Sequence, residues 1–388
     1  MKYKTLIPAI GLGLAAAGGA HAAPDPVDIL IQRLVQRNVI SKDDGDSIRA
    51  EIAAIAKENK AVEDKKKTAI SVTAKTPIKV SGYTQVRYQG ATQDGVNDSF
   101  DVRRVRLSLT GDATPVLDYG VLVDFAGSKK GLTDSTHSGA FGKPILVDGL
   151  LNYKFSPALK LTAGQFKVPF GYENLASDAL LDTVNRAAVT ETLVPGRDNG
   201  SLGRDIGVQV SGASAANPRS GQVEYQLGVY NGSGINVSDD NESKDLAGRL
   251  VWKPAVRGLS LGAAQYLGRK GTPHAKRDRT GLEAIYNRDP YSLKAEYVWA
   301  KDASLKRQGY YVTGAYKTSP VTQAVVRFDR LDPNTSVAND AASTWTAGLN
   351  YFLSKDTLNR VQVNYERHRE QGSQIANDLF LAQFQAGF

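Results

Sequence analysis

The 388-residue sequence has no cysteine, and its hydrophobic runs fall short of the ~18 residues that a membrane-spanning helix needs. Without cysteine there is no disulfide framework, so hydrogen bonds and packing must hold the chain together. The missing hydrophobic runs argue against a helical membrane protein. They leave a membrane-spanning β-barrel open, because barrel strands alternate apolar and polar residues.

Histidine is scarce as well, and this bears on catalysis. Beyond residue 22 the only histidines are His137, His274 and His368, which lie in or near predicted loops and far apart. The sequence contains no G-x-S-x-G motif and no cluster at metal-ligand spacing. We therefore expect no enzymatic activity, no metal site and no cofactor.

The first 22 residues have the pattern of an export signal. A basic start, Met1 to Lys4, precedes the apolar stretch Leu6 to Gly19, and Ala20-His21-Ala22 forms a cleavage site. A core helix or a membrane anchor is the alternative. Removing the two leading lysines lowers the net charge from +8 to +6, so the exported chain stays basic. Export makes nucleic acid the least suitable partner and favours anionic solutes or an anionic membrane surface.

Residues 23–76 follow a helical period. An apolar stripe begins at Val27, and Ser41 with Asp44 predicts the N-terminal cap of a second helix. The stripe is too short to require a coiled coil. An oligomerising or periplasm-facing arm, a hairpin packed on the main domain and a partly disordered leader all remain possible.

From residue 77 to residue 388 the period is two. We count sixteen alternating segments, most of them about ten residues long, which is the length of a tilted membrane strand. Tight turns alternate with long polar loops along much of this region, and the expected loops are residues 91–99, 126–144, 233–243, 268–279 and 332–342. The fold predicted is an all-β transmembrane antiparallel barrel of about sixteen strands in the bacterial outer membrane, in contact with its lipids.

Two further features belong to this barrel. The longest interruption, about 170–203, is expected to fold inside and narrow the lumen, with a loop over the outer rim as the alternative. The chain ends in alternating phenylalanines and on Phe388. Such an ending resembles the signal that the barrel-assembly machinery recognises.

Several stretches resemble the phosphate-selective porin O and P family. They are FDVRRVRLSLTG at 100–111, LNYKFSPALKLTAGQFKVPFG at 151–171, PGRDNG at 195–200, GRDIGVQV at 203–210, GVYNG at 228–232, AGRL at 247–250 and AEY at 295–297. The resemblance covers essentially all of 77–388. It implies a sixteen-stranded, homotrimeric outer-membrane porin whose selective members pass phosphate or polyphosphate along basic side chains of the lumen.

Arg104 and Arg106 are the leading candidates for anion contact. They share the polar face of one strand, roughly 6.5–7 Å apart, and guanidinium offers paired donors at any working pH. Strict alternation turns Arg103 away from that face, towards the interface, unless a local bulge intervenes.

Other basic residues extend the predicted site. Arg87 and Arg249 are in lumen phase, Arg197 and Arg204 flank the return from the long interruption, and the lumen candidates also include Lys167, Lys129 and Lys130. The phase of Lys167 is ambiguous, so we expect it near the rim or inward after a bulge. Lys129 and Lys130 begin a long loop at the mouth. The alternative for each residue is a structural charge, because Asp124, Asp205, Glu224, Glu283, Glu296 and Asp329 also fall on polar faces.

The sequence therefore favours a passive, anion-preferring channel, plausibly for phosphate or polyphosphate. A general porin with little phosphate selectivity is one alternative. A structural or adhesive barrel protein is another, of a different class.

Overall fold

The computed structural model describes residues 26–37, 39, 41–51, 53–54, 77–126, 144–271, 275–355 and 357–388. The chain forms two compact units, Met1–Thr73 and Ala74–Phe388. The expected export signal, residues 1–22, lies outside the described residues.

The N-terminal unit is helical in its described part. Helix α1 spans Pro26–Gln36, and residues 42–51 form a second helix. The Ser41 hydroxyl accepts the Asp44 N–H at 3.1 Å, and the Asp44 carboxylate accepts the Ser41 N–H at 3.2 Å. This reciprocal pair is a capping box. The hydrogen bonds from Ser41 also lower the pKa of Asp44. The helical character predicted for this region is confirmed.

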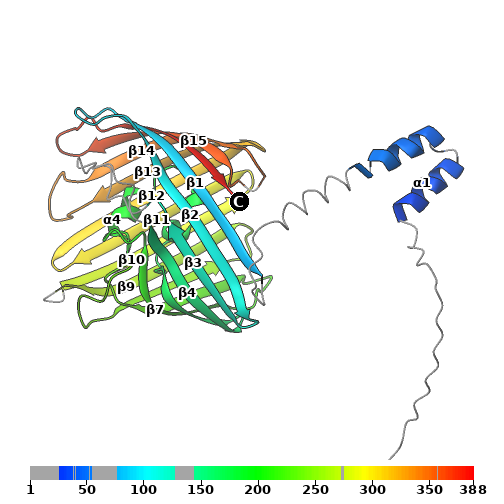
Figure 1. The fold of residues 1–388 in the computed structure, drawn as a ribbon. Coiled ribbons are helices and arrows are strands. Elements are labelled where there is room, and N and C mark those ends of the chain that lie inside the picture. Colours follow the sequence, from blue (N-terminus) through cyan, green and yellow to red (C-terminus); the bar gives the residue numbers. More distant parts are fainter. Residues whose placement is uncertain are drawn as a thin grey trace, which may run out of the picture. The chain divides into compact units, whose positions relative to one another are not determined.

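The second unit is a closed barrel of sixteen antiparallel strands (Figure 1), as predicted. The strands are β1 (Ile78–Ala91), β2 (Ser99–Thr114), β3 (Leu117–Asp124), β4 (Ile145–Ser156), β5 (Leu159–Lys167), β6 (Arg204–Ala213), β7 (Gln222–Tyr230), β8 (Asp245–Lys253), β9 (Leu259–Lys270), β10 (Ala275–Arg288), β11 (Tyr291–Asp302), β12 (Leu305–Ser319), β13 (Thr322–Asp332), β14 (Ala342–Phe352), β15 (Arg360–Glu370) and β16 (Leu379–Gly387). Each strand pairs with its sequence neighbours, and β1 pairs with β16. Phe388 completes this seam by exchanging two backbone hydrogen bonds with Gly82 at 3.0 and 3.1 Å.

The wall is apolar outside and polar inside. On β14, the outward Trp345 and Leu349 are 53% and 51% exposed, whereas the inward Thr346 and Asn350 are buried. Alternation along a strand puts successive side chains on opposite faces, and a lipid-facing barrel needs its apolar face outside. The polar lumen face is buried because other polar groups fill it.

The two rims differ in their connections. One rim, called here the short-turn rim, has two-residue turns at 115–116, 157–158, 289–290 and 320–321, and the C terminus lies there (Figure 1). The opposite, long-loop rim carries longer connections such as 231–244 and 333–341, with 303–304 as a short exception. The expected loop 268–279 is wrong: β9 and β10 pair from Ala275 and Lys270 onward. The ends of β9 and β10 carry polar residues on both faces, so the sequence shows no apolar–polar alternation there.

The chain between β5 and β6 folds inward. It contains α3 (Tyr172–Leu175), the 3₁₀ helix η1 (Asp178–Leu180) and α4 (Ala188–Leu193), drawn in green within the barrel in Figure 1. Several of its apolar side chains are fully buried against lumen-facing aromatic residues of the wall, in a cluster that includes Phe170, Val189, Leu193, Tyr266 and Tyr311. We call residues 168–203 the internal segment.

Candidate pore constriction

Hydrogen bonds fix the internal segment to strands around the lumen. Glu296 on β11 accepts the Tyr172 N–H at 2.9 Å, and Arg327 on β13 donates to the Asn185 carbonyl at 2.8 Å. Further anchors come from Asn350 on β14 to Asp182, Asn364 on β15 to Val184 and Gln385 on β16 to Ala179. A segment held from so many directions is a rigid obstruction, and it narrows the lumen.

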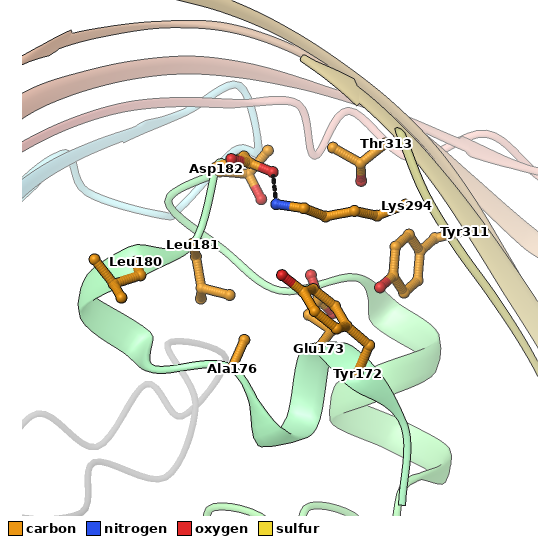
Figure 2. Close-up of a pocket in the computed structure, with 10 residues that line it drawn as sticks. Tyr172, Glu173, Ala176, Leu180, Leu181, Asp182, Lys294, Tyr311 and Thr313 are labelled. Atoms are coloured by element: carbon orange, nitrogen blue, oxygen red, sulfur yellow. Dashed lines mark hydrogen bonds and ion pairs between the residues drawn. The ribbon is translucent and has the colours of Figure 1, made fainter. Parts of the chain in front are cut away.

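One side of the segment is tied to β11 and β12 (Figure 2). Lys294 forms an ion pair with Asp182 and lies 5.7 Å from the centre of the Tyr172 ring. The Tyr311 hydroxyl donates to Glu296 at 2.6 Å. The pocket among these side chains has about 20 Å³ of free space, room for about one water molecule.

Asp178 is the centre of the opposite side, which faces β1 and β2. Its carboxylate pairs with Arg106, with Arg186 at 2.7 Å and with Arg104 at 3.4 Å. Burial alone raises the pKa of Asp178, but the neighbouring guanidiniums outweigh burial and hold the pKa well below its ordinary value. Asp178 therefore stays ionised and holds three arginines in one place.

Arg103 joins this group through a β-bulge. Gln85 pairs with Arg104, but the next residue, Val86, pairs with Val102, so Arg103 is the extra residue of β2. Its charge interacts with those of Arg87, Arg104 and Asp178. Strict alternation therefore fails at Arg103, and the bulge alternative holds. Its Nη1 atom is buried and has no hydrogen-bond partner among the described residues.

The β1–β2 arginine cluster has more guanidiniums than carboxylates. Its members are Arg87, Arg103, Arg104, Arg106 and Arg186, and the carboxylates among them are Asp101, Asp124, Asp178 and Glu191, the last lying 3.8 Å from Arg186. Arg87 is matched by Asp101 at 2.6 Å, and Arg106 by Asp124 at 2.9 Å. The uncompensated charge therefore resides on Arg103 and on Arg104, whose side chain is 14% exposed.

Of the remaining candidate arginines, Arg204 and Arg249 have partners elsewhere in the lumen, whereas Arg197 adjoins the cluster through Glu191, which also lies 3.8 Å from Arg186. Arg197 donates to Asn174 and Glu191, both at 2.8 Å. Arg204 pairs with Asp148 at 2.7 Å, and Arg249 with Glu283 at 3.0 Å. The structure does not bring these residues together with Arg104 and Arg106 into one ladder. Each of them forms an ion pair with a carboxylate, as expected for a structural charge of the lumen.

Among the lysine candidates, Lys167 turns towards the internal segment. Its ammonium donates to the carbonyls of Leu175 and Ala176 at 3.1 and 2.6 Å. Gly164, three residues earlier, has a φ of 125°, a backbone conformation that favours glycine and interrupts the regular strand. Lys129 and Lys130 lie outside the described residues.

Sequence reasoning missed a second basic group on β10, β13 and β15. Arg277 and Arg279 both reach Asp198 of the internal segment, at 2.9 Å. Arg327 lies 3.2 Å from Asp329, and Arg360 donates to the Leu181 carbonyl at 3.1 Å. The two β10 arginines were hidden by the expected loop 268–279. They lie at every second position with Gly281 and Glu283, and this alternation could have placed them on the lumen face of the strand.

Two kinds of feature are absent from the described part of the chain. No helix there combines the length and apolar character needed to cross a membrane. Nor do the same residues contain a group of three His, Asp or Glu side chains that could hold a metal ion.

The comparisons with known proteins agree with this architecture. No curated protein matches the chain by sequence. An anion-selective porin from Comamonas acidovorans is similar in structure at 14% identity, covering 81% of this chain and 100% of that chain with a TM-score of 0.55. The outer membrane channel DcaP of Acinetobacter baumannii covers 82% and 99% at 16% identity, with a TM-score of 0.55.

A third solved structure is the trimer form of OmpT, an outer membrane protein of Vibrio cholerae, with 12% identity, coverage of 81% and 99%, and a TM-score of 0.53. At these identities the likeness concerns the fold. The family model for phosphate-selective porin O and P matches residues 79–277 and 267–386, nearly the whole barrel. The chain belongs to the phosphate-selective porin O and P family and is a porin of the bacterial outer membrane.

Proposed function

We propose that the barrel is a water-filled channel for passive, anion-preferring diffusion, with phosphate-like anions as its solutes. The observation that carries this proposal is the excess of guanidinium in the β1–β2 arginine cluster. Five arginines face four carboxylates there, one of which, Glu191, also pairs with Arg197, and Arg103 has a buried donor without a partner among the described residues. A multivalent oxyanion supplies several acceptors, which suits phosphate or polyphosphate better than chloride. No enzymatic step is required.

In this mechanism Arg103 and Arg104 replace part of the water shell of the passing anion. The negative charge of Asp178 offsets part of the positive charge of the cluster. The cluster therefore binds the passing anion weakly, as conduction requires. Arg106 and Arg186 hold Asp178 in position and are positioning residues. The other lumen candidates have a structural role, as charges held by partners inside the barrel: Arg87, Arg197, Arg204, Arg249 and Lys167. At the mouth, Lys129 and Lys130 raise the local anion concentration.

Phosphate block of chloride current tests this proposal. In planar bilayers, added phosphate is expected to reduce chloride conductance of the wild type, and Arg103→Gln/Arg104→Gln is expected to weaken that block about ten-fold or more, because charge-assisted pairs contribute ~1.5–3 kcal/mol each. The matched control is Arg249→Gln/Glu283→Gln, which removes a balanced pair. Equal block in the wild type and the arginine variant would exclude this pair from the mechanism.

A general porin with little phosphate selectivity is the second candidate. The acid partners of Arg87, Arg204 and Arg249 favour it, because paired charges attract anions weakly. The same bilayer experiment separates the two candidates through the reversal potential in a salt gradient. A general porin would give a small potential that Arg103→Gln/Arg104→Gln leaves unchanged.

We also propose that the porin is a homotrimer. Its interface includes the outward face of β4–β8 in the half nearer the long-loop rim. An aromatic row marks the lipid boundary near the long-loop rim on β11–β14. Near the same rim β4, β6, β7 and β8 instead carry the aliphatic residues Leu146, Ile206, Val229 and Leu246. A neighbour in fold is a trimer, which supports the proposal. Residues 1–22 and Phe388 would direct export and barrel assembly.

Photo-crosslinking locates this interface, since the chain has no cysteine of its own. Val229→Cys, labelled with a benzophenone maleimide in the membrane, is expected to give crosslinked bands of up to three subunits. Leu349→Cys on β14 serves as the lipid-facing control and is expected to give none. Identical band patterns from both positions would contradict the proposed interface.

A further inference from the structure

Basic side chains form a band on the outside of the barrel, close to the long-loop rim. On β11 the outward Trp299 is followed two residues later by Lys301, and on β15 Tyr365 is followed by Arg367. On β13 Phe328 is followed in the same way by Arg330. In each strand the cation lies on the outer face, one step nearer the rim than the aromatic residue. We call this band the outer basic belt, and its members are Lys276, Lys301, Lys306, Arg330, Arg367 and Arg369.

The aromatic residues show where the belt lies relative to the membrane. Tyr297 and Tyr310 stack with ring centres 5.8 Å apart, Tyr310 is 6.0 Å from Phe328, and Phe328 is 4.7 Å from Trp345. Exposed aromatic rows of this kind occupy the boundary between hydrocarbon and headgroups. The belt, being nearer the rim, therefore lies at the level of the lipid headgroups.

Like charges meet directly across strands in the belt. Lys301 on β11 is the register partner of Lys306 on β12, and both side chains are exposed. Directly opposed like charges destabilise a sheet unless an anion lies between them. Arg330 and Arg369 are both register partners of Ser343.

Protein acids do not neutralise the belt. Asp278 beside Lys301, Asp332 on β13 and Asp378, 3.8 Å from Arg369, are the carboxylates near it in the described chain. Six cations therefore face three acids. In the lumen, by contrast, most arginines have a carboxylate partner at about hydrogen-bond distance.

We propose that the outer basic belt binds the phosphate groups of anionic lipid headgroups in the outer leaflet. The opposed pair Lys301/Lys306 is the centre of this docking surface, with Arg330, Arg367 and Arg369 extending it along β13 and β15. Phosphate oxygens add to the negative charge of Asp278, the single carboxylate among the described residues directly opposed to the Lys301/Lys306 pair, and the aromatic row packs against the adjoining acyl chains. The proposal depends on the membrane location of the barrel and is independent of which solute passes through it.

The three tryptophans of the chain provide a local readout. Trp299 and Trp345 lie beside the belt, whereas Trp252 lies at the short-turn rim, where its indole N–H donates to the Ser220 carbonyl at 2.8 Å. A protein with only Trp299, made as Trp252→Phe/Trp345→Phe, is reconstituted into phosphatidylcholine vesicles. Its fluorescence is then measured with either brominated phosphatidic acid or brominated phosphatidylcholine at equal mole fraction.

Phosphatidic acid is expected to quench Trp299 at a several-fold lower mole fraction than phosphatidylcholine does. Lys301→Gln/Lys306→Gln should remove most of this preference, with a loss of ~five-fold in relative affinity per cation. Lys317→Gln, at the other end of β12, is the matched control and should preserve it. A protein with only Trp252 should show no preference.

Three outcomes would overturn the proposal. The first is equal quenching of Trp299 by the two lipids. The second is a preference that survives Lys301→Gln/Lys306→Gln. The third is displacement of phosphatidic acid by inorganic phosphate in the buffer, since the belt would then be a site for the free anion and not for a lipid.

Discussion

Replacing residues 172–201 with a short glycine–serine linker is expected to raise the single-channel conductance several-fold. The internal segment is bonded to β1, β2, β10, β11, β13, β14, β15 and β16 and buries an apolar cluster of its own inside the lumen. It therefore occupies cross-section that water and ions would otherwise fill. Planar-bilayer recording of the purified variant measures the change.

The barrel itself is expected to survive this replacement. Lys167 and Arg204, the residues at the two ends of the segment, are direct register partners of β5 and β6, so a short linker can join them as a hairpin. Each strand retains both of its neighbours. Arginines that lose their partners then face water. The matched control inserts the same linker in the turn 254–258, and an unchanged conductance in the replacement variant would show that solutes do not pass the segment.

Asp178→Asn is expected to increase anion preference and to loosen the constriction. The substitution removes the one carboxylate that Arg104, Arg106 and Arg186 share. Breaking a buried ion pair from one side typically costs about 3–5 kcal/mol, and the positive charge left on the cluster is available to anions. The reversal potential in a chloride gradient should move towards anion selectivity, and the temperature at which the folded band is lost on denaturing gels should fall.

The control for this substitution is Asp112→Asn near the short-turn rim. Its side chain is 61% exposed and pairs with a half-exposed lysine, Lys154, so removing it should change neither measurement appreciably. Unchanged selectivity in Asp178→Asn would mean that Asp178 does not moderate the arginine cluster. Increased selectivity with unchanged thermal behaviour would separate the electrostatic role from the structural one.

Much of the fold was predictable from local pattern. A strand with lipid on one side and water on the other must alternate, and a closed barrel repeats that requirement in every strand. The alternating apolar residues of β2 and the alternating phenylalanines at the C terminus were therefore enough to predict that one face of each strand contacts lipid. The cap formed by Ser41 and Asp44 was predictable for the same reason, because its two partners are three residues apart.

The sequence by itself thus determined the barrel, its strand number, the helical arm and the lumen phase of Arg104 and Arg106. Only the tertiary structure decided what those arginines contact. Asp178 approaches Arg106 from 72 residues away, and no local period encodes that meeting. The bulge at Arg103 reverses a side chain that strict alternation turns outward, because one extra residue shifts the phase of a strand. Charge pairing across the lumen depends on distances in space, and the sequence records only distances along the chain.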